Sequence, residues 1–298
     1  MSAVQNLRLK IARLSWPVWL LIVTTLWLVA AGVLWWRIVY SDPRHVFEGM
    51  LRQNFSTVGY VRETDTTQQG VRSAEYAQLQ TGAQTLVRTL TALTQGQDEV
   101  ITDAISTREN EFVRYKKIDT SRKNEAGKEF DFSSAVNVWA KQASDGSNQA
   151  AAQMLLGLFP MGNVPAEDRR EILEFMDKNV VFSVKYNTVK KERKNGRPVY
   201  TYEVQLMPQP YVDMLKRYGT AVGLSNHVKN LNPADYANTA PTNLTVTVDV
   251  ISRQLKSVTF TESQGRKEVY SGHGILQDVQ LPTKTISASE LQQRLSAE

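Results

Sequence analysis

The sequence predicts an α+β domain built on one large curved antiparallel sheet of about eleven strands, an unclosed half-barrel with several covering helices and one N-terminal transmembrane helix. Three observations predict it. A stretch of 23 residues between Arg13 and Arg37 carries no charge. Beyond it, two blocks of segments alternate apolar and polar residues with the period of two that is typical of β-strands. Helical segments fall before and between these blocks and do not alternate with single strands, which argues against a parallel sheet.

The uncharged stretch is long enough to cross a membrane. At ~1.5 Å per helical residue it spans roughly 34 Å, against a hydrocarbon core of ~30 Å. Three basic residues precede it and two follow it before residue 45, a bias that predicts a cytoplasmic N-terminus. We therefore expect residues 1–15 to be a cytoplasmic n-region, residues 16–40 a signal-anchor helix and residues 41–298 an extracytoplasmic domain. The predicted location is the cell membrane, crossed once.

A cleaved signal peptide is the alternative interpretation of the same stretch. Val29-Ala30-Ala31 resembles a small-residue cleavage site. However, the apolar run continues to Trp36, which is too long for an ordinary signal-peptide core. Tryptophans also stand at both ends of the run, as in the aromatic belts of a transmembrane helix. These features favour the anchor.

Charge and cysteine content exclude several classes of function. Residues 1–44 hold five basic residues and one acidic residue, so the other 254 residues hold 30 Lys and Arg against 29 Asp and Glu. Without a basic excess in the main domain, we expect no nucleic-acid partner. The chain has no cysteine, which excludes disulfides, thiolate metal sites and a lipid anchor on cysteine.

A predicted helix precedes the first block. It begins at Asp42-Pro43, with proline at the first helical position, and runs to about residue 56. Residues 119–132 are polar and without a period, which predicts a loop. Between them lie five segments rich in Val, Ile, Thr and Tyr that we expect to be strands: 58–65, 71–80, 83–94, 99–106 and 111–118.

The second block is preceded by a region that we expect to be helical. The Asn195-Gly196 pair predicts a hairpin turn between its first two strands. The expected helices are 133–142, 148–159, 165–178 and 209–222. The expected strands are 179–187, 198–206, 244–251, 255–262 and 267–274.

Motifs for catalysis or metal binding are absent from the sequence. The three histidines, at positions 45, 227 and 273, are far apart and have no metal-ligand spacing. No nucleophile elbow, P-loop or dinucleotide fingerprint occurs. We therefore expect no catalytic residues, metal or cofactor, and a protein that is not an enzyme. A hydrolase whose residues are dispersed along the chain remains a third possibility.

Two segments are candidates for binding. Residues 150–162 are apolar nearly all round, which is typical of a buried core helix; the alternative is a lid over an apolar cavity, since methionine adapts to varied ligands. Residues 190–197 carry five basic residues at a hairpin tip. A solvated tip is the simpler interpretation, and contact with anionic lipid headgroups is the alternative. The residues for that contact are Lys190, Lys191, Arg193, Lys194 and Arg197.

The order of helix, antiparallel meander, internal helices and closing meander resembles the lipoprotein carriers LolA and LolB and the LppX/LprG-type lipoproteins. "NLTVTVDVISRQLKSVTF" resembles their paired strands around an Asp-containing turn, and "VYSGHGILQDVQLPTKTISASELQQRL" their closing strand, proline-bearing segment and tail. "RPVYTYEVQLMPQPYVDMLKRYG" is similar to their middle strand that runs into a helix. The resemblance implies an unclosed barrel around a cavity that holds acyl chains. This chain lacks the lipobox cysteine, which argues against a freely moving shuttle.

The first hypothesis is a membrane-anchored, non-catalytic domain that binds a lipid or acyl-chain ligand in a half-barrel cavity. The rival is an interaction or scaffold module for an envelope protein partner, with the sheet packed solid and no ligand. A continuous apolar void would favour the first, and close packing the second. The candidate cavity residues are Phe47, Met50, Leu51, Met154, Leu155, Phe159, Phe182, Tyr200 and Tyr202.

Overall fold

The computed structural model divides the chain into two compact units, Met1–Val46 and Phe47–Glu298. Each unit is described by itself. The residues that the structure describes are 15–81, 85–107, 109–123, 127–143, 153–261 and 265–296.

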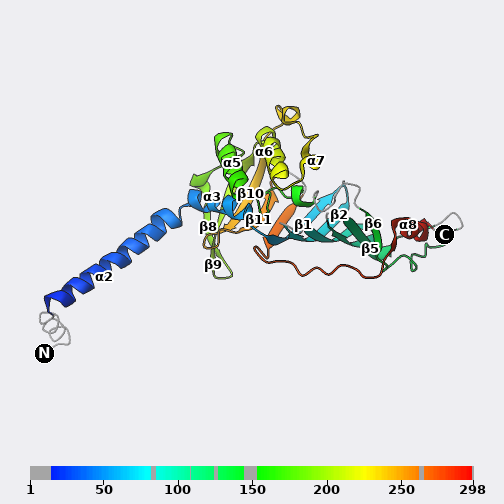
Figure 1. Ribbon diagram of the computed structural model, residues 1–298, viewed down its shortest axis with the longest axis horizontal. Coiled ribbons are helices and arrows are strands. Elements are labelled where there is room, and N and C mark those ends of the chain that lie inside the picture. The colour runs from blue at the N-terminus through cyan, green and yellow to red at the C-terminus, as the bar shows by residue number, and fades with distance from the viewer. Residues whose placement is uncertain are drawn as a thin grey trace. The chain divides into compact units, whose positions relative to one another are not determined.

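The first unit contains the apolar N-terminal helix. Helix α2 spans Trp16–Trp35 and continues into a π-helical turn, η1, at Trp36–Tyr40. Residues Trp16–Ile38 are long and apolar enough to cross a membrane, and none of the residues of α2 is buried (Figure 1). The two threonine hydroxyls within α2 donate hydrogen bonds of 2.8 Å to backbone carbonyls four residues earlier. These bonds satisfy polar atoms that would otherwise be costly in an apolar environment.

Helix α3, Pro43–Asn54, begins as the sequence predicts. The Oδ1 atom of Asp42 accepts hydrogen bonds from the backbone N–H groups of Arg44 and His45, at 2.9 and 3.2 Å. Asp42 thus caps the first turn, and proline occupies the position where no N–H is needed.

The second unit is built on a single sheet of thirteen strands, which confirms the predicted fold class. The strand order is β13-β6-β5-β4-β3-β2-β1-β12-β11-β10-β9-β7, with β8 paired to β9, and the sheet does not close on itself. All pairs are antiparallel except β13 with β6. The strands are β1 Gly59–Gln68, β2 Val71–Gln80, β3 Leu86–Gln95, β4 Asp98–Ser106, β5 Asn110–Asp119, β6 Ala140–Ala143, β7 Phe182–Val184, β8 Lys190–Lys194, β9 Arg197–Leu206, β10 Thr242–Asp249, β11 Leu255–Phe260, β12 Lys267–Ser271 and β13 Ile286–Ser287.

Two meanders make up this sheet. Strands β1 to β5 follow one another by hairpins, and β9 to β12 form the second meander. The β1–β12 pair joins them, with Val61 opposite Ser271. The predicted turn at Asn195-Gly196 connects β8 and β9, and both residues have positive φ, +50° and +78°. Asparagine and glycine tolerate that conformation better than other residues.

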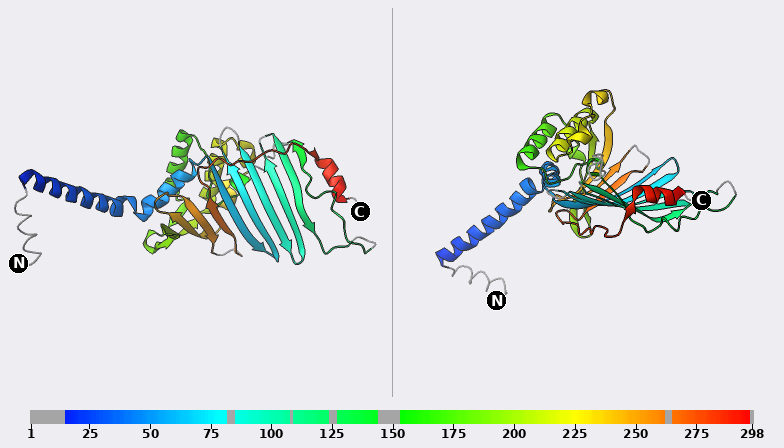
Figure 2. Two further views of the ribbon diagram at one scale, coloured as in Figure 1. Left: turned by 90° about the horizontal axis from the view of Figure 1, so that it is seen from below. Right: turned by 45° about the vertical axis from the view of Figure 1, so that its right-hand side comes forward.

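The helices cover one half of the sheet. Helices α5 and α6 lie above the part of the sheet from β8 to β12, the helical turn at residues 153–155 lies over β1 and β2, and no described helix lies above β3 to β5 (Figures 1 and 2). The extended segment after β12 runs along the opposite side of the sheet toward α8 (Figure 2). The helical elements are α5 Ala166–Lys178, η2 Tyr186–Thr188, α6 Pro208–Ala221, α7 Ser225–Val228, η3 Pro233–Tyr236 and α8 Ala288–Ser296.

The helix predicted at 133–142 is wrong. In its place, the chain makes turns and then joins the sheet as β6, which pairs with β5. Val136 forms a parallel bridge with Tyr115, and Asn137 has a positive φ of +62°, which a helix interior does not allow. The open edge of β5 supplies hydrogen-bond partners for the backbone of this segment, so pairing with β5 competes with helix formation.

The helix predicted at 148–159 is described only from residue 153 onward. Gln153–Leu155 is helical, and the chain then bends through residues 156–159. This part of the prediction is therefore wrong. The backbone of these residues bonds to side chains of the sheet and of α6 instead.

Candidate functional site

The concave face of the sheet is the candidate site. Side chains alternate along each strand, so Tyr202 on β9, Val246 on β10, Val258 on β11 and Tyr270 on β12 point to the helix-covered side and are buried. The same face continues across β1 and β2, beneath the segment 153–164, and then across β3 to β5, where no described helix covers it. The face thus has a closed half and an open half.

Aromatic rings fill the closed half. The rings of Phe159 and Phe182 are stacked with centroids 4.5 Å apart, and Phe47 on α3 meets Tyr202 at 5.3 Å. Phe47 also meets Phe159 edge-on at 6.4 Å. Tyr200 lies 6.3 Å from Tyr202. Five of the nine predicted cavity residues therefore come together, and their rings contact one another.

The other four predicted residues do not join these ring contacts. Met50 and Met154 are buried, and Leu51 and Leu155 are half-buried. Met154 lines a different cavity of about 300 Å³, which also touches Thr81 and the C-terminal end of α6. Whether the nine residues bind a ligand stays a prediction.

The apolar segment 153–164, which contains most of the predicted lid, is fastened to its surroundings by polar atoms. The carbonyl of Gln153 accepts a hydrogen bond from Arg62, that of Leu156 from Arg266 and that of Met161 from the Tyr218 hydroxyl. Met154, Phe159 and Met161 are buried beneath these bonds. The segment therefore combines an apolar underside with a polar attachment.

A buried ionic cluster lies beneath this segment. Arg62 on β1 is 1% exposed and donates to Glu75 on β2 at 3.1 Å. Glu268 on β12 is fully buried; it accepts hydrogen bonds from Arg266 at 2.6 Å and from the Tyr270 hydroxyl. These five residues balance charge inside the concave face, as buried charges require.

Burial changes the acidity of this cluster. It raises the pKa of Tyr60 to about 12 and that of Tyr270 well above its usual value, with the Glu268 carboxylate adding to the effect on Tyr270. Burial alone would lower the pKa of Arg62, but Tyr60, Tyr270, Glu75 and Glu268 together raise it. Arg62 is therefore charged and both tyrosines are neutral at physiological pH. The arrangement is suited to holding chain segments together, not to exchanging protons.

The open half holds an apolar cavity that the sequence does not predict. It has a volume of about 480 Å³ and lies at the end of the open half where β3 turns into β4. Leu93, Val100 and Ile118 are successive cross-strand partners on β3, β4 and β5, and they form its floor. Phe130 and Phe132, stacked at 5.8 Å, form a wall.

This cavity was missed because residues 119–132 show no apolar period. Two phenylalanines separated by Asp131 were the only available signal, and only the fold brings them to the strands. Three charged residues belong to the lining, namely Asp98, Asp119 and Arg122. An apolar space with a few charged groups in its lining can hold an apolar chain that ends in a polar group.

The basic residues predicted to meet a membrane surface lie on the exposed β8–β9 hairpin: Lys190, Lys191, Arg193, Lys194 and Arg197. The Nε atom of Arg197 lies 2.7 Å from Oδ2 of the buried Asp249, so Arg197 also anchors the hairpin to β10. The Nζ atom of Lys191 lies 5.3 Å from the centroid of Tyr200. Their contact with a membrane stays a prediction.

Among the described residues, no group of three or more His, Asp or Glu side chains could hold a metal ion. The rings of His227 and His273 lie in separate places, and neither faces a carboxylate within ion-pair distance in the part of the chain that the structure describes. The histidines therefore supply no evidence for a catalytic centre.

Comparisons with known proteins leave the family open. No protein-family profile and no curated protein matches the sequence. Among solved structures, the chain is similar to LprF from Mycobacterium bovis, with 7% identity over 79% of this chain and 96% of that one, and a TM-score of 0.41. A score of this size is too low to transfer a site or a ligand.

Proposed function

We propose that the protein is a single-pass membrane protein whose extracytoplasmic domain binds a lipid or another apolar ligand and catalyses no reaction. One observation carries the proposal, namely the cavity of about 480 Å³ on the open half of the concave face. Its size falls in the range of small-molecule sites, ~300–1,000 Å³, and its walls are largely apolar. The apolar helix α2 supports a membrane location, with residues 1–15 in the cytoplasm.

The nine residues predicted from the sequence form a second candidate seat for the ligand, in the closed half. Their rings are in contact in this structure, so a ligand would enter there only if the segment 153–164 moved away. Methionine side chains would adapt to such a change more easily than branched ones. The hydrogen bonds from Arg62, Arg266 and Tyr218 would have to break first.

The scaffold hypothesis remains the second candidate. The stacking of Phe159 on Phe182 at 4.5 Å favours it, because a solidly packed closed half leaves no room for a ligand. In that case the domain would bind an envelope protein partner and no lipid.

Photolabelling distinguishes these hypotheses. The full chain, purified from its native membranes in a non-ionic detergent, is illuminated with a fatty acid that carries a diazirine, and the labelled peptides are mapped by mass spectrometry. We expect labels on the β3–β5 peptides and on Phe130 or Phe132. Labels on α3, the segment 153–164 and β9 instead would support the second seat. Labels on α2 alone would overturn lipid binding and leave the scaffold.

Cavity-filling variants provide the control. Leu93→Trp should fill the cavity and reduce labelling of the β3–β5 peptides by about fivefold or more, since the probe loses its contact area. Tyr76 lies on the opposite face of the sheet and is 39% exposed. Tyr76→Trp should therefore leave the labelling unchanged. Equal loss in both variants would mean that the label reports unfolding.

A further inference from the structure

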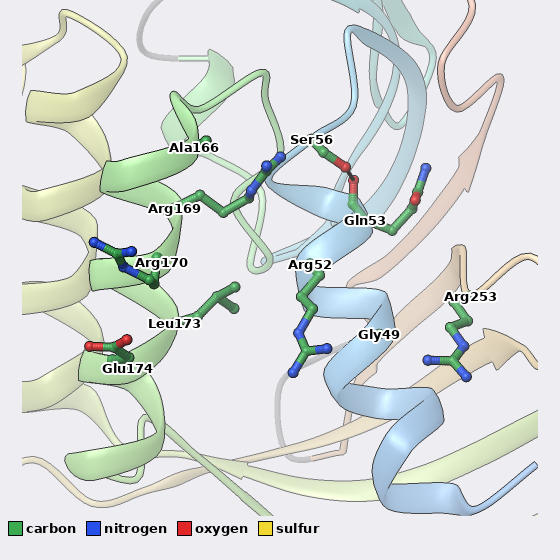
Figure 3. A pocket seen from close by; sticks show the side chains of 10 residues that line it. All are labelled: Gly49, Arg52, Gln53, Ser56, Ala166, Arg169, Arg170, Leu173, Glu174 and Arg253. Carbon is green, nitrogen blue, oxygen red and sulfur yellow. Dashed lines mark hydrogen bonds between the residues drawn. The ribbon is translucent and has the colours of Figure 1, made fainter. Parts of the chain in front are cut away.

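A second groove lies between α3 and α5, and its lining is basic. It has a volume of about 770 Å³ (Figure 3). In Figure 3, Arg169 extends from α5 toward α3, and Arg52 projects from α3 on the side that faces α5. Its lining residues are Gly49, Arg52, Gln53, Ser56, Ala166, Arg169, Arg170, Leu173, Glu174 and Arg253.

Helical spacing places these residues on two facing surfaces. On α3 the lining positions 49, 52, 53 and 56 follow the i, i+3, i+4, i+7 pattern of one helix face. On α5 the positions 166, 169, 170, 173 and 174 do the same. The facing surfaces of α3 and α5 therefore form the two walls of the groove.

Charge is segregated on α5. Asp168 and Glu171 line a different cavity, on the α6 side, together with Lys216 and Arg217. Arg169 and Arg170 line the groove, and Glu174 is its only carboxylate among the described residues. In Figure 3, Arg52 and Arg169 lie between the two helices, whereas Arg170 and Glu174 extend to the side of α5 turned away from α3, and Arg253 lies on the other side of α3.

Three of these arginines have no protein partner among the described residues. The guanidinium groups of Arg52, Arg169 and Arg170 make no hydrogen bond or ion pair there, although arginines elsewhere in the domain do. Like charges on Arg52, Arg169 and Arg170 repel one another, and an anion would relieve that repulsion. These three guanidinium groups therefore lack a counter-charge within ion-pair distance among the described residues.

Arg253 reaches the groove because of a glycine. It stands in the β10–β11 turn with a φ of +53°, and its side chain lies against the surface of α3 at Gly49. A Cβ atom at position 49 would come within 2.4 Å of Cδ and 2.6 Å of Nη1 of Arg253. Any larger residue at position 49 would displace this fourth guanidinium.

The N-terminal end of α5 contributes little positive potential. No side chain caps its first turn, where Ala166 lines the groove, but Glu167 and Asp168 stand in the same turn and offset the helix dipole. An anion in the groove would therefore be bound by the arginines. Guanidinium groups bind phosphate oxygens through two parallel hydrogen bonds. We propose that the α3–α5 groove binds a phosphate group, either of a lipid headgroup or of a free phosphate compound.

The test uses the full chain in a non-ionic detergent and two soluble probes, inorganic phosphate and dihexanoylphosphatidylglycerol below its micelle concentration. Binding is followed by isothermal titration calorimetry. We expect saturable binding of at least one probe by the unmodified chain. Tighter binding of the lipid would identify a headgroup as the source, and tighter binding of inorganic phosphate would identify a free phosphate compound.

Variants tie the binding to the groove. Arg52→Ala with Arg169→Ala should weaken binding about tenfold or more, because charge-assisted bidentate hydrogen bonds are lost. Arg52→Lys with Arg169→Lys keeps the charge and should show a smaller loss. Lys229→Ala with Lys284→Ala removes two exposed charges that belong neither to the groove nor to the β8–β9 hairpin, and it serves as the matched control, with no expected change.

Three results would overturn the proposal. They are the absence of saturable binding of either probe, a loss in the Lys229/Lys284 control equal to that in the groove variant, and unchanged binding in the Arg52→Ala/Arg169→Ala variant. Each variant's thermal unfolding midpoint is measured in parallel, so that misfolding is recognised. The groove and the apolar cavity have no lining residue in common, so failure of one proposal leaves the other standing.

Discussion

Asp103 on β4 shows how one residue can hold three strands together. Its carboxylate is fully buried and accepts hydrogen bonds from Arg88 on β3, at 3.0 Å to each oxygen, and from Arg114 on β5 at 2.7 Å. Burial alone would raise the pKa of Asp103, but the two arginines lower it below its usual value. The carboxylate is therefore charged at all physiological pH values.

Replacing this carboxylate should destabilise the fold. We expect Asp103→Asn to reduce the free energy of unfolding by about 2–3 kcal/mol, because two guanidinium groups lose their counter-charge and an amide cannot accept both pairs of bonds. Asp65→Asn breaks the exposed Asp65–Arg72 pair and should cost less than about 1 kcal/mol. Thermal unfolding followed by tryptophan fluorescence measures both. Equal effects would show that burial of Asp103 contributes nothing.

His273 should make stability depend on pH. Its Nε2 bonds to the carbonyl of Leu255 at 2.9 Å, and burial lowers the pKa of His273 to about 4. The unfolded chain takes up this proton near pH 6.5, whereas the folded chain does not. Stability should therefore be complete above pH 6.5 and fall by on the order of 3 kcal/mol as the pH drops toward 4.

The check is the unfolding midpoint as a function of pH. His273→Gln should reduce the fall of the unfolding midpoint between pH 6.5 and 4. The same substitution at the exposed His45 should leave that fall unchanged. A curve that is equally steep in both variants would assign the pH dependence to other groups.

Among the elements, those with a clear period were predicted correctly. The helix beginning at Pro43, those over 165–178 and 209–222, and nine of the ten expected strands form close to their expected bounds. The exception is the strand expected at 179–187, of which only Phe182–Val184 is a strand, while Lys190–Lys194 pairs with β9 next to the predicted turn. The errors fall at 133–142 and 156–159, where tertiary partners override local preference. In the first case, the unpaired edge of β5 competes with helix formation. Sequence alone does not reveal such an edge.

Part of the candidate site could be predicted from the sequence. Five aromatic residues that were expected to share a cavity do meet in the fold, although they are spread between positions 47 and 202. The cavity at Phe130 and Phe132 and the groove at Arg52 and Arg169 join residues that are far apart in sequence. The charge segregation on α5 was visible as helical spacing, but the position of Arg253 depends on the fold alone.

The contact between α6 and α7 offers a test at the scale of elements. A Cβ atom at Gly219 of α6 would lie 2.5 Å from Cγ1 of Val228 of α7. We expect Gly219→Ala to destabilise the protein by about 1–3 kcal/mol, since the methyl group overpacks a buried contact. When Val228 is already alanine, Gly219→Ala should reduce the free energy of unfolding by less than it does in the unmodified chain. Two effects that simply add would show that the helices adapt without strain.

For the whole molecule, the fate of the N-terminal helix is the decisive observation. If α2 is an anchor, the mature protein begins before residue 16, resists extraction by alkaline carbonate and has its full mass. We expect this result, because the apolar stretch exceeds the thickness of the hydrocarbon core. A mature N-terminus at Gly32 would instead identify a signal peptide, and the domain would be free of the membrane. Ala31→Leu should leave the mature N-terminus of an anchored protein unchanged.

The β1–β12 pair also governs the order in which the sheet can assemble. Each meander can form from neighbouring segments, but Val61 and Ser271 are about 200 residues apart in the chain, and this pair is the joint between the meanders. Contacts of such long range make folding slow. Until β12 is delivered to it, the first meander carries an open edge at β1, and open edges invite pairing with other chains. Strand β1 therefore stays unpaired on one side until β12 has been synthesised, and we expect incomplete chains that lack β12 to aggregate more readily than the complete chain.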